Sequence, residues 1–258
     1  MFKKPLGLLG IFLIVISIGY FIGAGVAWSR VQGGYDSLQA FSEAQNVQLS
    51  YNEDGELIDR GTVEGAEAIR SLLEDDWDFP VVSGDLDSGD PLVNSASEYM
   101  FQMATIVYHT LTGTQTVTLT EADLTDEDGN VMTEFDCNGE TVEVPDPFPE
   151  EGITCDFEVD GRYWTDFDRM DPVQGKARDL AWSGTVHGLV GELGVGAATH
   201  STLQLGLGIA ALLAGLGVVT LVMGIAFVWH TRNNLRAEAA LAGDDAGAAT
   251  ADDQPTPA

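Results

Sequence analysis

The chain has 258 residues, of which 45% are hydrophobic, and 41 acidic against 11 basic side chains give a formal net charge of −30 at pH 7. So acidic a protein repels the phosphate backbone of nucleic acids, which argues against nucleic-acid binding, and it attracts cations and basic partners. The same charge keeps a protein soluble and suits a salt-rich habitat, and we favour this interpretation over a dedicated cation site, leaving weak cation association as the alternative.

Two apolar segments, residues 6–28 and 203–229, lie near opposite ends of the chain. Each exceeds the roughly 20 residues that a helix needs to cross the hydrocarbon core of a bilayer. Lysine and arginine close to a span stay in the cytoplasm, and such residues flank the two outer ends: Lys3, Lys4, Arg232 and Arg236. We therefore predict a plasma-membrane protein with two spans and both termini in the cytoplasm.

This topology divides the chain into five segments. Residues 29–202 contain 36 acidic and seven basic side chains, a net charge of −29, so nearly all the charge lies between the spans. The predicted segments are a cytoplasmic flank (1–5), a first transmembrane helix (6–28), an acidic extracytoplasmic domain (29–202), a second transmembrane helix (203–229) and a disordered cytoplasmic tail (230–258).

A cleaved signal peptide is the alternative interpretation of the first apolar segment. Gly25-Val26-Ala27 loosely resembles a cleavage site. However, the hydrophobic region of a signal peptide is typically about 7–15 residues long, and this segment is longer. We expect it to be retained as an anchor, and the middle segment lies outside in either case.

The first part of the outer segment predicts a hairpin and two helices. Residues 47–51 alternate as a strand does, Asn52–Gly55 supplies a turn, and Glu56–Ile58 returns. Residues 64–75 have a helical pattern with apolar side chains on one face. A longer helix is predicted to begin at Asp90-Pro91 and to end before Gly113, with a buried stripe formed by Met100, Met103, Ala104, Val107 and Leu111.

Residues 114–165 change to the period of short strands. Thr116–Thr120 alternates, and the turn sequences Asp128-Gly129, Asn138-Gly139 and Asp160-Gly161 separate further short runs at 131–135, 141–144, 155–159 and 162–164. Cys137 and Cys155, the only cysteines, are expected to form one disulfide, because a pair of cysteines in an oxidising compartment is typically bridged. The fold class is therefore a membrane protein with two transmembrane helices and an α+β extracytoplasmic domain, whose amphipathic helices accompany a small antiparallel, disulfide-stapled sheet.

Residues 176–202 predict an apolar, glycine-rich helix that leads into the second span. Its apolar positions include Leu180, Trp182, Val186, Leu189 and Leu193. This helix either extends the span outward or lies on the membrane surface, and the pattern favours neither alternative.

The spans contain no charged residue, which argues against an ion or proton pathway of the usual kind. Small residues recur at four-residue spacing, at Gly19 and Gly23 in the first span and at Gly206, Ala210 and Ala214 in the second. Such stripes allow close approach of helices, so we predict that the spans pack on each other or on another membrane protein.

One distinctive segment is Tyr163-Trp164-Thr165-Asp166-Phe167-Asp168-Arg169-Met170-Asp171-Pro172. Together with the first span, the helix ending at Gly113 and the glycine-rich approach to the second span, it gives the chain a resemblance. The chain resembles a group of small actinobacterial membrane proteins with two spans. This chain departs from the group by inserting the cysteine-containing hairpins. Members often carry the description "aromatic ring-opening dioxygenase". The resemblance implies a family without an established biochemical activity.

The dioxygenase description does not transfer to this chain. Extradiol ring cleavage needs a metal held by two histidines and a carboxylate, whereas His109, His187 and His200 are too dispersed to predict a ligand cluster. Asp126–Asn130 lacks the carboxylates that a calcium loop requires at its first and twelfth positions and predicts a plain turn. Asp166, Asp168 and Asp171 are expected to make local turn and cap interactions with Arg169.

We therefore predict no catalytic, cofactor-binding or metal-binding residues and no cofactor. The expected function is that of an accessory or interaction subunit that contacts membrane lipid and either a membrane-protein complex or further copies of itself. An extracytoplasmic sensor or a ligand- or cation-binding membrane protein is the alternative, and a metal-dependent enzyme is the least favoured class.

Overall fold

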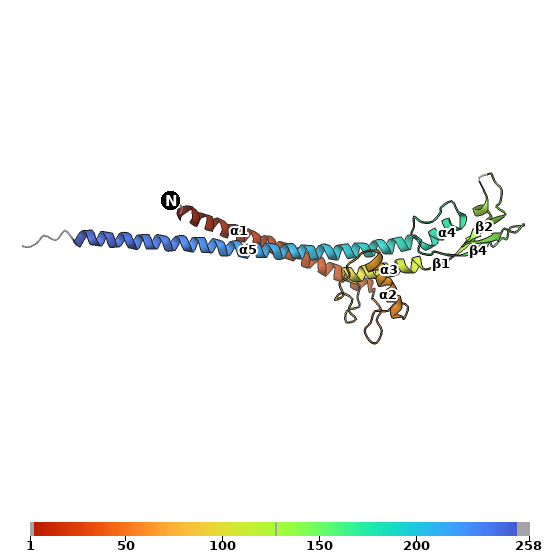
Figure 1. The fold of residues 1–258 in the computed structure, drawn as a ribbon, viewed down its shortest axis with the longest axis horizontal. Coiled ribbons are helices and arrows are strands. Elements are labelled where there is room, and N and C mark those ends of the chain that lie inside the picture. The colour runs from red at the N-terminus through yellow and green to blue at the C-terminus, as the bar shows by residue number, and fades with distance from the viewer. Residues whose placement is uncertain (1–2, 127, 252–258) are drawn as a thin grey trace, which may run out of the picture. The chain divides into compact units, whose positions relative to one another are not determined.

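The computed structural model describes residues 3–126 and 128–251, with the backbone alone for residues 3–4 and 241–251. The chain forms two compact units (Figure 1). The first, which we call the helix pair, combines residues 1–37 with residues 202–258, and the second, which we call the domain, comprises residues 38–201.

Two long helices account for the helix pair. They are α1 (Lys3–Gln45) and α5 (Gly184–Ala251), and both continue beyond the helix pair into the domain. Each is long and apolar enough to cross a membrane. The most apolar 18-residue stretch has a mean hydropathy of 2.4 within Pro5–Gln45 and of 2.5 within Gly184–Ala240. The predicted spans 6–28 and 203–229 are thus parts of longer helices, because no proline interrupts either helix after its first turn.

The tail after residue 229 is largely helical, and the prediction of a segment without stable structure was wrong as far as Ala251. This stretch is rich in alanine, which has the highest intrinsic helix propensity. Residues 252–258, the last part of that prediction, lie outside the described residues.

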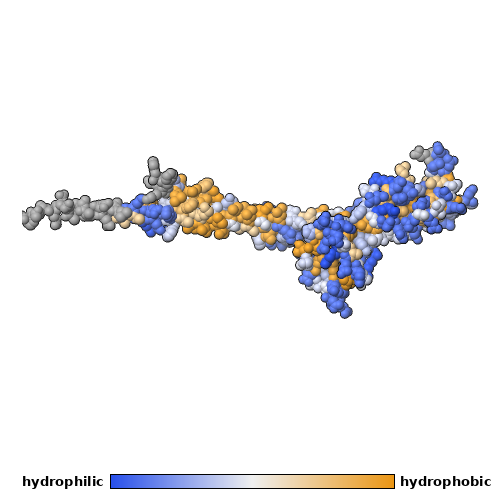
Figure 2. Space-filling view, in the orientation of Figure 1, coloured by the Kyte–Doolittle hydropathy of each residue, from blue (hydrophilic) through white to orange (hydrophobic). Residues whose placement is uncertain are grey.

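The surface of the helix pair is largely apolar (Figure 2). Large apolar side chains remain exposed along both helices, among them Leu8 at 72%, Ile22 at 63% and Leu212 at 62%. In the most apolar stretch of each helix only 11% of the residues are buried. A water-soluble protein rarely exposes so continuous an apolar surface.

The first helix of the domain agrees with its prediction. The α-helix α2 (Val63–Ser71) continues into a π-helical turn, η1 (Leu72–Asp76), which together match the predicted 64–75. Thr62 caps the start, its hydroxyl accepting a hydrogen bond from the Gly65 N–H at 3.1 Å. The apolar face, formed by Ala66, Ile69, Leu72 and Leu73, is buried as expected.

The main helix of the domain, α3 (Ala96–Leu111), begins later than predicted, at Ala96 instead of at Asp90-Pro91. Ser95 and Glu98 form a reciprocal capping box at its start, and this pair outcompetes the Asp90-Pro91 signal. Residues before it instead lie extended, where Leu92 pairs with Gln48. Of the predicted stripe, Ala104, Val107 and Leu111 are buried, whereas Met100 and Met103 are half-buried.

The strands form two separate two-stranded sheets rather than one. Antiparallel β1 (Thr114–Leu119) and β4 (Ile153–Glu158) pair through Val117 and Cys155. The hairpin of β2 (Glu134–Cys137) and β3 (Glu140–Glu143) turns at Asn138-Gly139, both with positive φ, as predicted. A short 3₁₀ helix, η2 (Glu121–Leu124), follows β1.

The disulfide predicted between Cys137 and Cys155 is present and links β2 to β4, thereby joining the two sheets. Other predicted strands were wrong in extent. Residues 47–51 and 56–58 make only isolated pairs, Gln48 with Leu92 and Tyr51 with Leu57, and residues 162–164 after Asp160-Gly161 form no strand.

Residues 176–202 belong to two helices rather than to one. The first, α4 (Pro172–Ala181), is capped by Asp171 and packs against β1 and β4, and α5 begins after a break at residues 182–183. Leu193 and Ala197 of α5 are buried in the core of the domain, where Val186 and Val190 also pack. The first turns of α5 thus use their apolar face within the domain and continue without interruption into the second predicted span.

Candidate functional site

An apolar cavity of about 230 Å³ lies within the domain. The C-terminal part of α1, the extended residues Val47 and Val93, α3, and the first turns of α5 surround it. Its lining residues are Phe41, Ser42, Gln45, Val47, Val93, Tyr99, Gln102, Ile106, Leu189, Glu192 and Leu193.

The floor and the rim of this cavity differ in exposure. Ser42, Val93, Tyr99 and Leu193 are buried and form the floor, with relative exposures of 2–8%. Phe41, Gln45, Leu189 and Glu192 are exposed and form the rim. The opening therefore carries an aromatic side chain, an aliphatic side chain and one carboxylate.

Two hydrogen bonds connect the helices around the cavity. On the floor the Ser42 hydroxyl lies 2.8 Å from the Tyr99 hydroxyl. At the rim the Gln45 amide donates to Glu192 Oε1 at 2.9 Å. Sequence reasoning missed all four residues, because the partners lie 57 and 147 positions apart and no local pattern marks them.

A buried glutamate fixes the start of α3, from which Tyr99 reaches the cavity. Glu98 is 2% exposed, and its Oε2 accepts hydrogen bonds from the backbone N–H groups of Asn94 (2.9 Å) and Ser95 (2.7 Å). Burial raises the pKa of the Glu98 carboxyl above its usual range, although these hydrogen bonds act in the opposite direction. The Tyr99 ring then packs on α5 at Gly196, where an added Cβ would lie only 2.6 Å from the ring.

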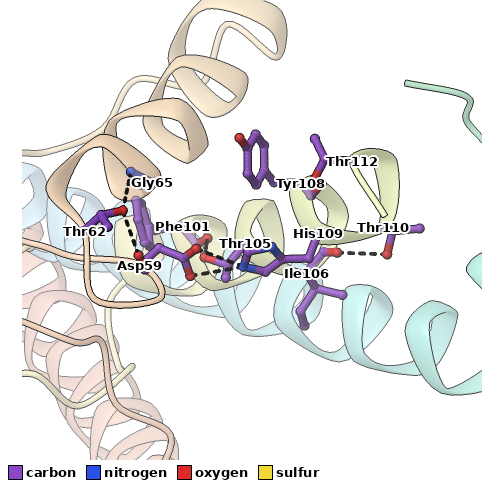
Figure 3. A network of polar contacts seen from close by, with 10 residues as sticks. All are labelled: Asp59, Thr62, Gly65, Phe101, Thr105, Ile106, Tyr108, His109, Thr110 and Thr112. Carbon is purple, nitrogen blue, oxygen red and sulfur yellow. Dashed lines mark hydrogen bonds and ion pairs between the residues drawn. The ribbon is translucent and has the colours of Figure 1, made fainter. Parts of the chain in front are cut away.

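His109 joins the end of α3 to the turn before α2 (Figure 3). Its Nε2 lies 3.0 Å from Oδ2 and 3.1 Å from Oδ1 of Asp59. The backbone carbonyl of Asp59 also accepts a hydrogen bond from the Thr62 hydroxyl, the same hydroxyl that caps α2. The His109 imidazole therefore has a carboxylate partner from another element, and it ties the end of α3 to this turn.

The distinctive segment 163–172 builds a cluster of aromatic and cationic groups. The Trp164 ring lies under the guanidinium of Arg178 at 4.3 Å and near that of Arg169 at 5.9 Å, and His187 meets its edge at 5.1 Å. Such cation–π contacts are each worth about 0.5–1 kcal/mol at exposed sites. Arg169 thus contacts an aromatic ring, which the sequence did not indicate.

The aspartates of this segment make local turn and cap interactions as predicted, but with backbone N–H groups rather than with Arg169. Asp166 accepts a hydrogen bond from the Tyr163 N–H, Asp168 accepts one from the Met170 N–H, and Asp171 caps α4. The turn at Asp126 is of the same kind, since its carboxylate accepts from the backbone N–H groups of Asp128 and Asn130. These hydrogen bonds, with that from Asn130 the strongest, hold the pKa of the Asp126 carboxyl below its usual range.

The other two histidines of the domain, His187 and His200, contact different elements. His187 packs on Trp164, and His200 Nδ1 accepts a hydrogen bond from the Ala96 N–H at 3.1 Å. Burial lowers the pKa of His200, while the negative charge of Asp85 acts to raise it. Among the described residues, no three His, Cys, Asp or Glu side chains gather in a group that could hold a metal ion.

The helix pair brings some of the predicted small residues to the α1–α5 contact. A Cβ at Gly206 would lie 2.8 Å from Val31, and one at Gly23 would lie 3.6 Å from Leu213, while Ala210 is 3% exposed. A Cβ at Gly19 would meet no atom within 4 Å, and Ala214 is half-buried. The predicted four-residue stripe therefore coincides with the contact only in part.

The buried small residues instead recur every seven positions. They are Gly10, Ser17 and Ala24, followed by Val31, on α1, and Ala210, Gly217 and Gly224 on α5. The two backbones approach closely at Gly10 and Gly224, where an added Cβ on either would come within 2.8 Å of the other's carbonyl oxygen. A seven-residue repeat keeps one face of each helix against its partner in a left-handed crossing.

No family model matches this chain, and no curated protein or solved structure is significantly similar to it. The resemblance to small actinobacterial two-span proteins therefore stays a prediction.

Proposed function

We propose that the chain is a plasma-membrane protein with two spans and cytoplasmic termini, which presents an acidic domain on the extracytoplasmic side as an accessory or interaction subunit without catalytic activity. The observation that carries this proposal is the exposed apolar surface of the helix pair. Lipid covers such a surface without cost, and other membrane helices can pack on it.

Further features support the orientation and the role. Lys3, Lys4, Arg232 and Arg236 lie at the outer ends of the spans, against Arg30 alone at an inner end. The disulfide is typical of an oxidising compartment outside the cytoplasm. The net charge of −29 on residues 29–202 favours association with a basic partner surface.

The orientation is testable by labelling single introduced cysteines, since both native cysteines are bridged. Ser83→Cys in the domain should react with a membrane-impermeant maleimide in intact cells. Ala240→Cys should react only after the membrane is permeabilised. The opposite pattern would refute the proposed topology.

The interaction role is testable by purification in a mild detergent, followed by mass spectrometry and measurement of the native mass. We expect one partner of constant stoichiometry whose binding weakens as salt rises, because screening shortens electrostatic attraction to about 10 Å at 0.1 M ionic strength. A native mass of two or more copies of this chain alone would assign the homo-oligomer instead. A monomer under cross-linking conditions in native membranes would contradict both.

A further inference from the structure

The cavity has the size and the surface of a small-ligand site. Its volume of about 230 Å³ exceeds the apolar cavity of about 150 Å³ that takes up benzene in another protein. It therefore has room for an apolar body of about ten non-hydrogen atoms. Valine, isoleucine, leucine and two aromatic side chains line it, so such a body would replace poorly solvated space with apolar contacts.

The polar groups of the floor do not require a hydrogen-bonding partner from a ligand. The hydroxyls of Ser42 and Tyr99 hydrogen-bond to each other at 2.8 Å. A ligand that buries them therefore leaves neither hydroxyl without a partner, and it loses little by presenting only carbon to the floor. This favours a ligand whose buried end is purely apolar.

The residues at the rim favour a positive charge on the end of the ligand that lies at the opening. Glu192 is exposed there, and its Oε1 accepts a single hydrogen bond, from Gln45, whereas a carboxylate has about four acceptor positions. None of the described lining residues is basic. A ligand cation could approach the carboxylate and the ring of Phe41 together, while a ligand anion would meet repulsion.

The charge of the whole segment acts in the same direction. Residues 29–202 have a net charge of −29, which raises the local concentration of cations and lowers that of anions. The cavity thus favours a small molecule with an apolar body and a positive charge. Its size, its apolar lining, the carboxylate at its opening and the surrounding negative field all point to this class.

We infer that the cavity formed by α1, α3 and α5 within the domain binds a small cationic amphiphile, with its apolar body on the floor against Tyr99 and Leu193 and its ammonium group at Glu192. This site is independent of the accessory role proposed above, because the binding belongs to the purified chain and needs no partner protein.

The test uses two probes that share a phenyl group and a four-carbon chain but differ in charge, 4-phenylbutylamine and 4-phenylbutyrate. Each is titrated calorimetrically into the full chain in nanodiscs of zwitterionic lipid, with empty nanodiscs subtracted. We expect saturable binding of one amine per chain, at least about tenfold tighter than that of the carboxylate. Equal affinities, or no saturable binding of the amine, would overturn the inference.

Two variants locate the site. Glu192→Gln should reduce the preference for the amine several-fold, and the matched control Glu140→Gln, which removes the same charge from β3, should leave it within about twofold. Ile106→Trp should fill the cavity and abolish binding of the amine in a chain that keeps its folded near-ultraviolet dichroism. An equal effect of both charge variants would overturn the role of Glu192, whatever the outcome for Ile106→Trp.

Discussion

Glu98 illustrates how a single acidic side chain becomes structural in a chain crowded with acids. Of the 36 acidic residues in 29–202, this one is nearly removed from solvent, at 2% exposure. Its carboxylate accepts hydrogen bonds from two backbone N–H groups at the start of α3, which would otherwise lack acceptors. The residue therefore decides where α3 begins.

Replacing Glu98 separates its hydrogen bonds from its charge. Glu98→Ala should lower the free energy of unfolding by about 1–3 kcal/mol, because it leaves two buried donors unpaired. Glu98→Gln keeps an acceptor oxygen and should stay within about 1 kcal/mol of the native chain, since burial already disfavours the ionised form. Urea denaturation in detergent, followed by tryptophan fluorescence, measures both; equal losses in the two variants would contradict this account.

The pKa of the Asp123 carboxyl is lowered, whereas that of Glu98 is raised. Partial burial works against its ionisation, but hydrogen bonds from the Lys176 ammonium and from Thr120 outweigh this effect and lower the pKa of the carboxyl below its ordinary 3.8. Lys176 also donates to the Thr118 carbonyl at 3.0 Å and thereby fastens α4 to the end of β1.

The pH dependence follows from the direction of this shift. A carboxyl with a lowered pKa in the folded state stabilises the protein above pH 3.8, and this contribution disappears as the pH falls through the lowered value. Asp123→Asn should therefore cost up to about 1 kcal/mol at pH 7, and the difference should vanish near pH 2. Denaturation curves at the two pH values test this, with Asp76→Asn, an exposed acid, as the control.

At the scale of elements, α5 contains glycines of two kinds within the domain. Gly196 is required by the Tyr99 ring, whereas a Cβ at Gly188 would meet no atom within 4 Å. The contrast separates a steric requirement from the general glycine richness of this helix.

Gly196→Ala should destabilise the domain by about 1–3 kcal/mol, because the added methyl overlaps a buried aromatic ring. Gly188→Ala in the same helix should be neutral or stabilising by up to about 1 kcal/mol, because alanine favours the helix over glycine. Thermal unfolding of both variants decides the point. Destabilisation by both would show that helix flexibility, and not the ring contact, is what matters.

The sequence predicted those elements whose signals are local. The turn at Asn138-Gly139, the helix over 64–75 and the disulfide needed only neighbouring residues or a compartment argument. The start of α3 was missed because two cap signals compete within a few residues, and only packing chooses between them. The cavity was beyond prediction, because its floor joins Ser42 to Tyr99 and its rim joins Gln45 to Glu192 across long separations.

At the scale of the whole molecule, the apolar and the charged residues are segregated along the chain. Residues 29–202 contain most of the acids, while the helix pair contains most of the exposed large apolar side chains. The seven-residue spacing of small side chains determines how α1 and α5 meet within the helix pair, and it can be tested in the membrane.

The pair Gly7→Cys and Thr231→Cys should form a disulfide on oxidation in membranes. A Cβ at Gly7 would lie 3.4 Å from that of Thr231, near the separation of about 3.5–4.5 Å found in disulfides. Adding Gly224→Ile should reduce the yield, because the side chain would collide with the Gly10 carbonyl, whereas Gly215→Ile, which faces open space, should not. Non-reducing electrophoresis reports the yield; an unchanged yield with Gly224→Ile would refute the Gly10–Gly224 crossing.

The disulfide between Cys137 and Cys155 closes a covalent ring that contains residues 138–154. A protease that cuts the chain once within this ring opens a peptide bond but releases no fragment. The nicked protein would keep its full mass until a reductant separates it into two pieces. A single cut between Cys137 and Cys155 therefore leaves the rest of the domain covalently joined to both α1 and α5.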